Sequence, residues 1–147
     1  MNGDTKLIIP GLGKIYHALG PVSYAVARFA MGGVIMVHGY NKLFNGMAPM
    51  VADKVLAPLG LPMPLVFAYF LGTLEFFGCA LLAVGFLTRP IAAMLTFEFV
   101  IVTFCVQMPR GYGENVEYTL MLLVMAALFA ANGGGRYSID RLIGREF

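Results

Sequence analysis

Residues 65–87 read LVFAYFLGTLEFFGCALLAVGFL, and this stretch of 23 residues contains a single charged side chain, that of Glu75. An α-helix rises about 1.5 Å per residue, so about 20 apolar residues cross the hydrocarbon core of a bilayer. The stretch follows Pro58, Pro62 and Pro64, and proline is common where a helix begins. It therefore predicts a membrane-spanning helix with one carboxyl group near its middle.

Three further apolar segments resemble it in length. They cover about residues 22–44, 90–108 and 115–131, and glycine or proline lies beside their ends. Backbone groups in lipid must be hydrogen-bonded within the protein, and the segments lack the alternation of a transmembrane β-barrel. We predict an all-α integral membrane protein in which residues 22–132 form a bundle of four transmembrane helices.

Composition supports this class of protein. The chain has 147 residues, 59% of them hydrophobic and 12% charged, with a mean hydropathy of +0.79. A soluble domain carries about 25% charged residues. The net charge of +2 is small and dispersed, which argues against a nucleic-acid partner. The lipid bilayer is the predicted environment.

The two ends of the chain lie outside the predicted bundle. Residues 1–21 form an N-terminal arm without the apolar core of a cleaved signal peptide. Within it, residues 12–20 fit either a short helix in the membrane interface or a polar arm. Residues 133–147 form the predicted C-terminal tail, which starts with three glycines that end the last helix.

Basic residues predict the orientation. With four spans both termini share one side, and that side holds six of the nine flanking basic residues. The six are Lys6, Lys14, Arg89, Arg136, Arg141 and Arg145; the other three are Lys42, Lys54 and Arg110. Basic residues favour the cytoplasmic side, so we expect both termini in the cytoplasm of a bacterial cell and the spans in its inner membrane.

Polar side chains within the spans are the candidate functional groups. They are Arg28, His38 and Lys42 in the first span, Glu75 in the second, Glu98 and Gln107 in the third, and Glu117 in the fourth. A charge at the centre of a spanning helix costs about 2.5–3.5 kcal/mol on insertion scales. Such residues persist where partners offset that cost or where function requires them.

Helical geometry predicts how these groups meet. At about 100° per residue, Arg28 shares a stripe with Gly39 and Lys42, and Glu75 shares one with Gly72. Small residues allow close helix approach, so we expect the Arg28 and Glu75 faces to point inward. From the rise per residue, Arg28 lies about 9 Å from the cytoplasmic end of its span, which suits pairing with Glu98 or a reach to Glu75.

The remaining polar groups form a second predicted layer near the outer end of the bundle. It consists of His38, Lys42, Gln107 and Glu117. On the third span Glu98 and Gln107 point about 180° apart at regular helical geometry, which favours an oligomer or a partner subunit facing one of them.

Each group also has a structural interpretation. An ion pair of Arg28 could only fix the helix register, and Lys42 could extend its ammonium group to the lipid headgroups. His38 could be a hydrogen-bonded core residue, and Gln107 and Glu117 could cap helix ends.

Several kinds of cofactor are disfavoured. His38 is the only histidine within a span, so a bis-histidine haem lacks a second ligand, and no CxxC pair is present for an iron–sulfur site. Phosphate-loop, GxSxG and HExxH motifs are also absent. We expect no haem or metal, and a redox role would need a diffusible cofactor such as a quinone, or a partner's metal.

Three stretches resemble the DoxX family. They are RFAMGG at 28–33 leading to HGYNKL at 38–43, GTLEFFG at 72–78 followed by LLAVGFLTR at 81–89, and GGGRYSID at 133–140. Glu117, near the start of the last helix, also fits the family. The resemblance implies a four-helix inner-membrane protein.

The resemblance also suggests a function. Related DoxD-type subunits belong to thiosulfate:quinone oxidoreductases, so it implies a subunit of a quinone-linked oxidoreductase. Glu75 and His38 would then carry protons, while the candidate cofactor-binding residues are Arg28, Lys42, Glu98, Gln107 and Glu117. Two alternatives stay open: a non-catalytic accessory or assembly subunit, and a pathway for a small solute or protons.

Overall fold

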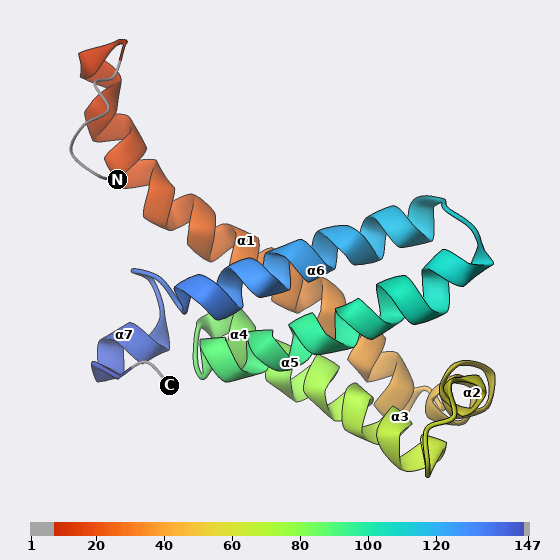
Figure 1. Cartoon of the computed structure of the whole chain (residues 1–147). Coiled ribbons are helices and arrows are strands. Elements are labelled where there is room, and N and C mark those ends of the chain that lie inside the picture. Colours follow the sequence, from red (N-terminus) through yellow and green to blue (C-terminus); the bar gives the residue numbers. More distant parts are fainter. Residues whose placement is uncertain (1–7, 146–147) are drawn as a thin grey trace.

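The computed structural model describes residues 8–145 of the chain, and this part consists of helices and short connections, without strands. Four of its helices are long and apolar enough to cross a membrane, at Pro10–Phe44, Pro64–Val84, Thr88–Arg110 and Glu114–Asn132. The predicted all-α, four-span architecture is confirmed. Figure 1 shows how the spans follow one another along the chain.

The spans contain several helical segments. The first span comprises the 3₁₀ turn η1 (Pro10–Leu12) and α1 (Gly13–Phe44), and the fourth is α6 (Glu114–Asn132). The second span comprises α3 (Pro64–Thr73), the π-helical turn η4 (Leu74–Gly78) and α4 (Cys79–Val84). The third span comprises α5 (Thr88–Ile101), the π-helical turn η5 (Val102–Gln107) and the 3₁₀ turn η6 (Met108–Arg110). The first connection contains α2 (Ala48–Val51), the π-helical turn η2 (Ala52–Leu56) and the 3₁₀ turn η3 (Ala57–Leu59). Helix α7 (Ile139–Ile143) follows the last span.

The first helix begins earlier than predicted. Residues 13–21 are continuous with the span, and Pro21 lies inside α1. Proline breaks a helix mainly by removing one N–H and crowding a carbonyl one turn earlier. Here that turn is solvent- or lipid-exposed, and the start of α1 projects beyond the other helices (Figure 1). Of the two alternatives for residues 12–20, the structure shows the helix, which is continuous with the first span from Gly13 instead of being a separate segment. Residues 1–7 lie outside the described part.

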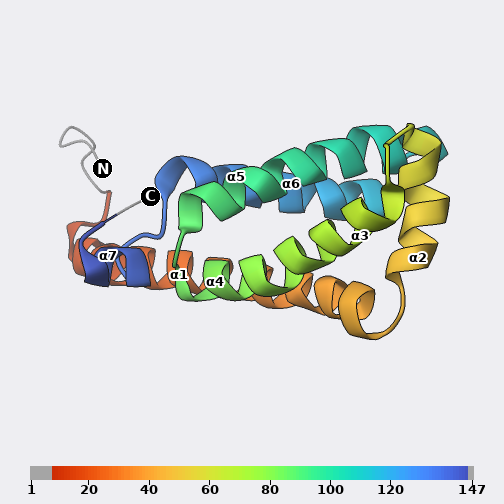
Figure 2. The ribbon, with the colours of Figure 1, turned by 90° about the horizontal axis from the view of Figure 1, so that it is seen from below.

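The four spans pack as two pairs. Helix α1 lies along α3, η4 and α4, and α5 lies along α6. The pairs meet through α4, η4 and α5, and Figure 2 shows them as two layers with the α2 segment crossing one end. The core between them is apolar and includes Ile35, Leu82, Leu95 and Phe129, each almost inaccessible.

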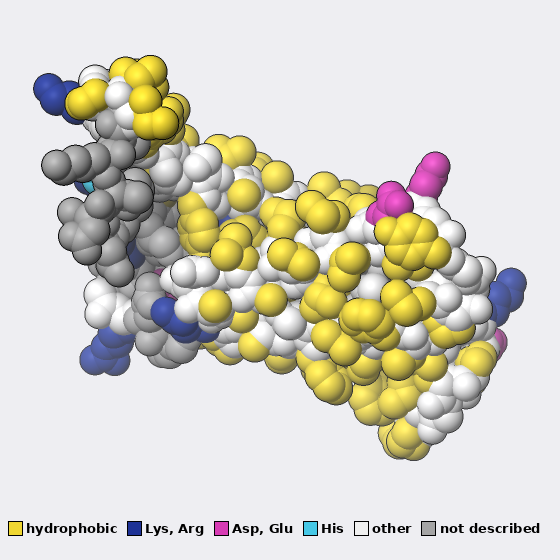
Figure 3. All heavy atoms as spheres, turned by 45° about the horizontal axis from the view of Figure 1, so that its top comes forward, with side chains coloured by type: hydrophobic (Ala, Val, Ile, Leu, Met, Phe, Trp, Pro, Cys, Tyr) yellow, Lys and Arg dark blue, Asp and Glu magenta, His cyan; other side chains and the backbone are white. Residues whose placement is uncertain are grey.

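The outer surface is largely apolar. Figure 3 shows hydrophobic side chains across the middle of one face, with charged side chains gathered toward the two ends of the molecule. Exposed residues such as Val37, Phe77 and Val124 point outward from three different spans. In a protein without a membrane such a surface would aggregate, whereas a bilayer covers it.

Two glycines of α1 allow it to approach the second span closely. A Cβ atom on Gly32 would lie 2.7 Å from the carbonyl oxygen of Cys79, and one on Gly39 would lie 2.7 Å from the carbonyl carbon of Glu75. Side chains do not fit at these separations. The small-residue faces of the first two spans, which were expected to point inward, thus lie directly against each other.

The described part of the C-terminal tail folds back onto the bundle. The Asp140 carboxylate accepts hydrogen bonds from the backbone N–H groups of Leu87 (2.9 Å) and Thr88 (3.0 Å), where α5 begins. The Asp140 N–H in turn donates to the carbonyl of Gly85 at 2.9 Å. Asp140 is 1% exposed. This segment thus supplies the N-terminal cap of α5, which its own sequence lacks.

Candidate functional site

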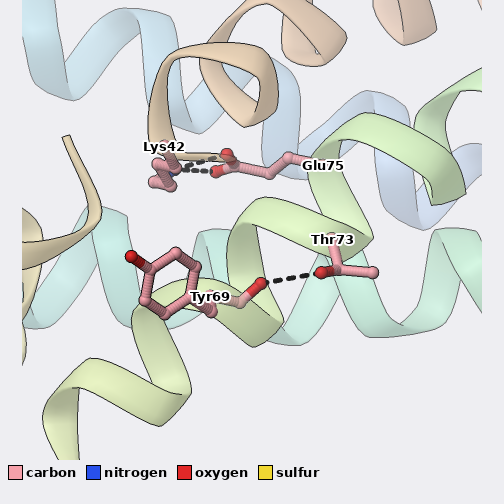
Figure 4. A network of polar contacts seen from close by, with 4 residues as sticks. All are labelled: Lys42, Tyr69, Thr73 and Glu75. Atoms are coloured by element: carbon pink, nitrogen blue, oxygen red, sulfur yellow. Dashed lines mark hydrogen bonds and ion pairs between the residues drawn. The ribbon is translucent and has the colours of Figure 1, made fainter. Parts of the chain in front are cut away.

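A buried ion pair joins the first two spans. Lys42, in the last turn of α1, donates to both carboxylate oxygens of Glu75 on η4. The two side chains are 14% and 7% exposed. Figure 4 shows them pointing toward one another from the two helices. Lys42 therefore does not extend to the headgroups as a lone charge, and that interpretation is wrong.

Local backbone structure positions this pair. Glu75 lies on a π-helical turn, which follows a hydrogen bond from the Thr73 hydroxyl to the carbonyl of Tyr69 (2.8 Å; Figure 4). Threonine bonds of this kind bend helices, and π-helical turns shift the side chains that follow them. A Cβ on Gly72 would lie 3.0 Å from the Cβ of Lys42. The glycine lets the lysine stem pass close to the second span.

A second carboxyl group lies beside the ion pair. Glu98, on α5, is 6% exposed, and the charges of both Glu75 and Lys42 act on it. Its Oε2 atom has no hydrogen-bond partner among the described residues. Buried polar atoms are almost always paired, so an unpartnered carboxyl oxygen points to a place where a ligand could bind. We refer to Lys42, Glu75 and Glu98 as the charged trio.

The charged trio lines a cavity of about 800 Å³ between the two helix pairs. Its size lies within the range of about 300–1,000 Å³ that is typical of small-molecule sites. Most of the lining is apolar and comes from α3, α5 and the connection between the first two spans. The polar lining residues are His38, Lys42, Glu75, Glu98, Gln107, Arg110, Asn115, Tyr118 and Thr119.

The cavity brings together five of the seven candidate residues from the sequence. These are His38, Lys42, Glu75, Glu98 and Gln107. His38 stands near the ring of Tyr118, with 6.4 Å between ring centroids. Glu117 is exposed and lies outside the cavity, so the predicted outer layer of four residues does not form as a unit.

Arg28 has different partners from those predicted. Its guanidinium group donates to the backbone carbonyls of Gly134, Tyr137 (2.7 Å) and Ala83 (3.5 Å), and Arg28 is 2% exposed. The predicted pairing with Glu75 or Glu98 is wrong. The physical reason is that the folded-back C-terminal segment offers carbonyl oxygens, which satisfy a buried guanidinium without any carboxylate.

The third span also departs from regular helical geometry. Glu98 and Gln107 both line the cavity, although they were expected to point in opposite directions. The π-helical turn Val102–Gln107 lies between them. Its wider i→i+5 hydrogen bonding changes the rotation per residue and brings Gln107 round to the face of Glu98. The oligomer or partner subunit was expected because Glu98 and Gln107 were predicted to face opposite sides. Since both face the cavity, this reason no longer holds.

Some residues of the site were missed in the sequence. Arg110 and Asn115 flank the short connection between the last two spans, and Tyr118 follows one turn later. For Asn115 and Tyr118, the position relative to Glu117 could have indicated this. They lie two residues before and one residue after Glu117, so they point to other faces of α6 than the exposed Glu117.

Comparison with known proteins agrees with this architecture. The DoxX family model matches residues 23–108, which include most of α1, the whole second span and most of the third. The chain belongs to the DoxX family. The matched region contains the full charged trio of this DoxX protein.

One curated relative is an inner membrane protein, YphA of Escherichia coli (strain K12). It is 31% identical over 84 residues, which cover 56% of this chain and 56% of that protein. The chain thus spans about half the length of the relative that it matches. No solved structure matches it. Together with the four apolar helices, this relationship supports a multi-pass protein of the bacterial inner membrane.

Proposed function

We propose that this DoxX protein binds a quinone in the cavity and serves as the membrane subunit of a quinone-linked oxidoreductase. One observation carries the proposal: a mainly apolar cavity of about 800 Å³ holds the charged trio, in which Glu98 Oε2 has no partner among the described residues. Binding sites for small molecules combine apolar walls with a few convergent polar groups in this way.

The polar groups suit a quinone headgroup, whose two carbonyl oxygens accept hydrogen bonds. A lysine ammonium has three N–H donors, and Lys42 directs its bonds to the two oxygens of Glu75. One N–H is left to donate to a ligand oxygen. In its protonated form Glu98 would donate a second hydrogen bond, and the apolar walls would hold the ring.

The same residues suit proton-coupled reduction. Reduction of a quinone to its quinol takes up two electrons and two protons. Lys42 would stabilise negative charge as it develops, since fixed charges act strongly in a water-excluded site. Glu98 and His38 would each release one proton, and the ionised Glu75, which acts on Glu98, would take up replacement protons and pass them to it. The electrons would come from a partner subunit, and the resemblance to DoxD-type proteins makes thiosulfate the electron donor to test first.

The first experiment measures binding. Protein purified from the bacterial membrane is extracted with solvent for endogenous quinone and then titrated with a decyl-tailed benzoquinone. We expect saturable binding that weakens about tenfold or more in Lys42→Met, which corresponds to about 1.4 kcal/mol. Glu117→Gln is the matched control, because Glu117 is exposed and lies outside the cavity. A wild-type protein without extracted quinone or saturable binding would contradict the proposal.

The second experiment measures turnover with thiosulfate in native membranes. Glu75→Gln keeps the shape of the side chain and can still accept from Lys42, but it cannot carry a proton. We expect this variant to bind quinone and to lose quinone reduction. Normal turnover in Glu75→Gln would exclude Glu75 as a proton carrier.

A specific observation favours a second candidate, a non-catalytic accessory subunit. The Lys42–Glu75 pair is complete without any ligand, and it links the first two spans. A buried pair of this kind can fix helix register alone. The accessory role would replace the first proposal if Lys42→Met disrupted assembly with the partner subunit while no quinone bound to the wild type.

A further inference from the structure

We infer that the cavity opens sideways into the bilayer between α3 and α5, so that its ligand enters from the lipid and keeps an apolar tail in this opening. The inference rests on the proposed function, since it names how the quinone headgroup and tail would lie. It assigns the ligand to the class of lipid-soluble molecules with a polar ring and a long hydrocarbon chain.

The first argument is the exposure of residues in the cavity wall. Phe67 and Phe70 on α3 line the cavity and are 39% and 54% exposed. Met94 and Phe97 on α5 line it as well and are 43% and 70% exposed. A side chain that borders a cavity and also reaches the outer surface stands at an opening. We call these four residues the lateral opening.

The second argument is depth. At about 1.5 Å per residue, Phe67 and Phe70 lie about 4 Å and 9 Å from the start of the second span. On the antiparallel third span, Phe97 and Met94 lie about 20 Å and 24 Å from Arg110, which is at the same end. The two pairs thus lie at different depths along the gap between α3 and α5, and all four residues fall within a hydrocarbon layer of about 30 Å, so the lateral opening faces lipid tails.

The third argument is the cover over the nearest end of the bundle. The segment from α2 to η3 packs on α3 through a small core of Ala48, Ala52, Leu56 and Ala68. Val51, Val55 and Leu59 of this segment line the cavity from that end. A large apolar ligand that came from water would have to displace this cover, whereas entry from the bilayer leaves it in place.

The polar wall lies away from the lateral opening along α5. Gln107 and Arg110 border the cavity near the end of the third span, together with Asn115 at the start of the fourth. The charged trio is 6–14% exposed, whereas the residues of the lateral opening are 39–70% exposed. The ligand therefore has a preferred direction, with its ring inside at the charged trio and its tail toward Phe70 and Phe97. The hydrocarbon tail would contact the apolar side chains of the lateral opening, and the ring would accept hydrogen bonds from the charged trio.

The test uses the absence of tryptophan from the natural sequence. A single tryptophan is placed by Phe97→Trp, in the lateral opening, and the protein is reconstituted in phosphatidylcholine nanodiscs. The probe is a decyl-tailed benzoquinone with a bromine atom at the tail end, compared with the same quinone without bromine. The quinone ring quenches tryptophan fluorescence, and bromine adds quenching only where the tail end lies near the indole.

Two matched variants complete the design. Phe104 lies on the same span, in η5, and is 48% exposed but outside the cavity. Phe104→Trp therefore reports bromine that is merely dissolved in lipid. Tyr118→Trp borders the cavity from α6 on its polar side. Met94→Trp replaces Phe97→Trp if the latter does not fold, as judged by size-exclusion chromatography.

We expect saturable bromine-dependent loss of fluorescence in Phe97→Trp, a smaller and non-saturable loss in Phe104→Trp, and loss from the ring alone in Tyr118→Trp. Bromine-dependent loss in Tyr118→Trp instead of Phe97→Trp would overturn the lateral opening while quinone binding stands. Equal, non-saturable losses in all three variants would mean that no quinone binds, and the proposed function would fail as well.

Discussion

Lys42 and Glu75 form an ion pair between the first two spanning helices, on the wall of the cavity of about 800 Å³. The pair lies where Gly39 and Gly72 bring the helices together. It takes the place of the contact between Arg28 and a carboxylate that the sequence predicts. Because each partner is mostly buried, the pair links helix packing to the chemistry of the cavity.

The first prediction concerns the coupling of this pair. Removing one partner of a buried ion pair costs about 3–5 kcal/mol in soluble proteins, and polar contacts in membranes are worth less. We expect Glu75→Leu and Lys42→Met each to destabilise the protein, and the double variant to lose less than the two losses added together. Reversible unfolding in detergent gives the free energy of unfolding of the wild type, the two single variants and the double variant.

Arg28 provides the control for this cycle. It bonds to carbonyls of Ala83, Gly134 and Tyr137, whereas Glu75 bonds to Lys42. Arg28→Lys combined with Glu75→Leu should therefore be additive within about 0.5 kcal/mol. Coupling of Arg28 with Glu75, together with additivity for Lys42, would refute the assignment of partners.

The second prediction concerns close helix approach. Gly39→Ala places a Cβ 2.7 Å from the carbonyl carbon of Glu75 and 2.8 Å from the carbonyl oxygen of Gly72, so the two spans must separate. We expect a lower melting temperature and weaker quinone binding. Gly33→Ala is the control, since its Cβ meets nothing within 4 Å. Equal melting temperatures for the two variants would show that the contact is not tight.

The third prediction concerns the C-terminal segment. Asp140→Ala removes both bonds to the N–H groups of Leu87 and Thr88, and loss of an N-terminal cap typically costs about 0.5–2 kcal/mol. We expect faster proteolysis within residues 133–145 in limited digestion. Asp140→Asn keeps one acceptor oxygen, so its rate of proteolysis should lie between those of the wild type and Asp140→Ala. Leu142 is 87% exposed, and Leu142→Ser should be digested at the wild-type rate. Wild-type resistance to proteolysis in Asp140→Ala would contradict the role of Asp140 as the N-terminal cap of α5.

The fourth prediction concerns topology. Six of nine flanking basic residues lie on the side of the termini, so both termini should be cytoplasmic. Reporter fusions after Phe147 and within residues 48–60 should report opposite compartments. A periplasmic C-terminal reporter would reverse the orientation and place the α2 cover on the cytoplasmic side.

The candidate site was predictable in its residue types but not in its pairing. Lys42, Glu75 and Glu98 stand out because charged residues are costly in apolar segments. Their arrangement depends on where the π-helical turns fall, and a change from i→i+4 to i→i+5 bonding leaves no clear mark in the residue pattern. The direction predicted for Gln107 was wrong for this reason.

The sequence by itself determined the class of the protein, the four spans and the inward direction of the small-residue faces of the first two, because hydropathy over about 20 residues and the spacing of glycines are local properties. Only the tertiary structure decided that Arg28 binds the carbonyls of the C-terminal segment and that the charged trio lines one cavity. Backbone carbonyls are present at every residue, so nothing in the sequence marks which of them a buried side chain will reach.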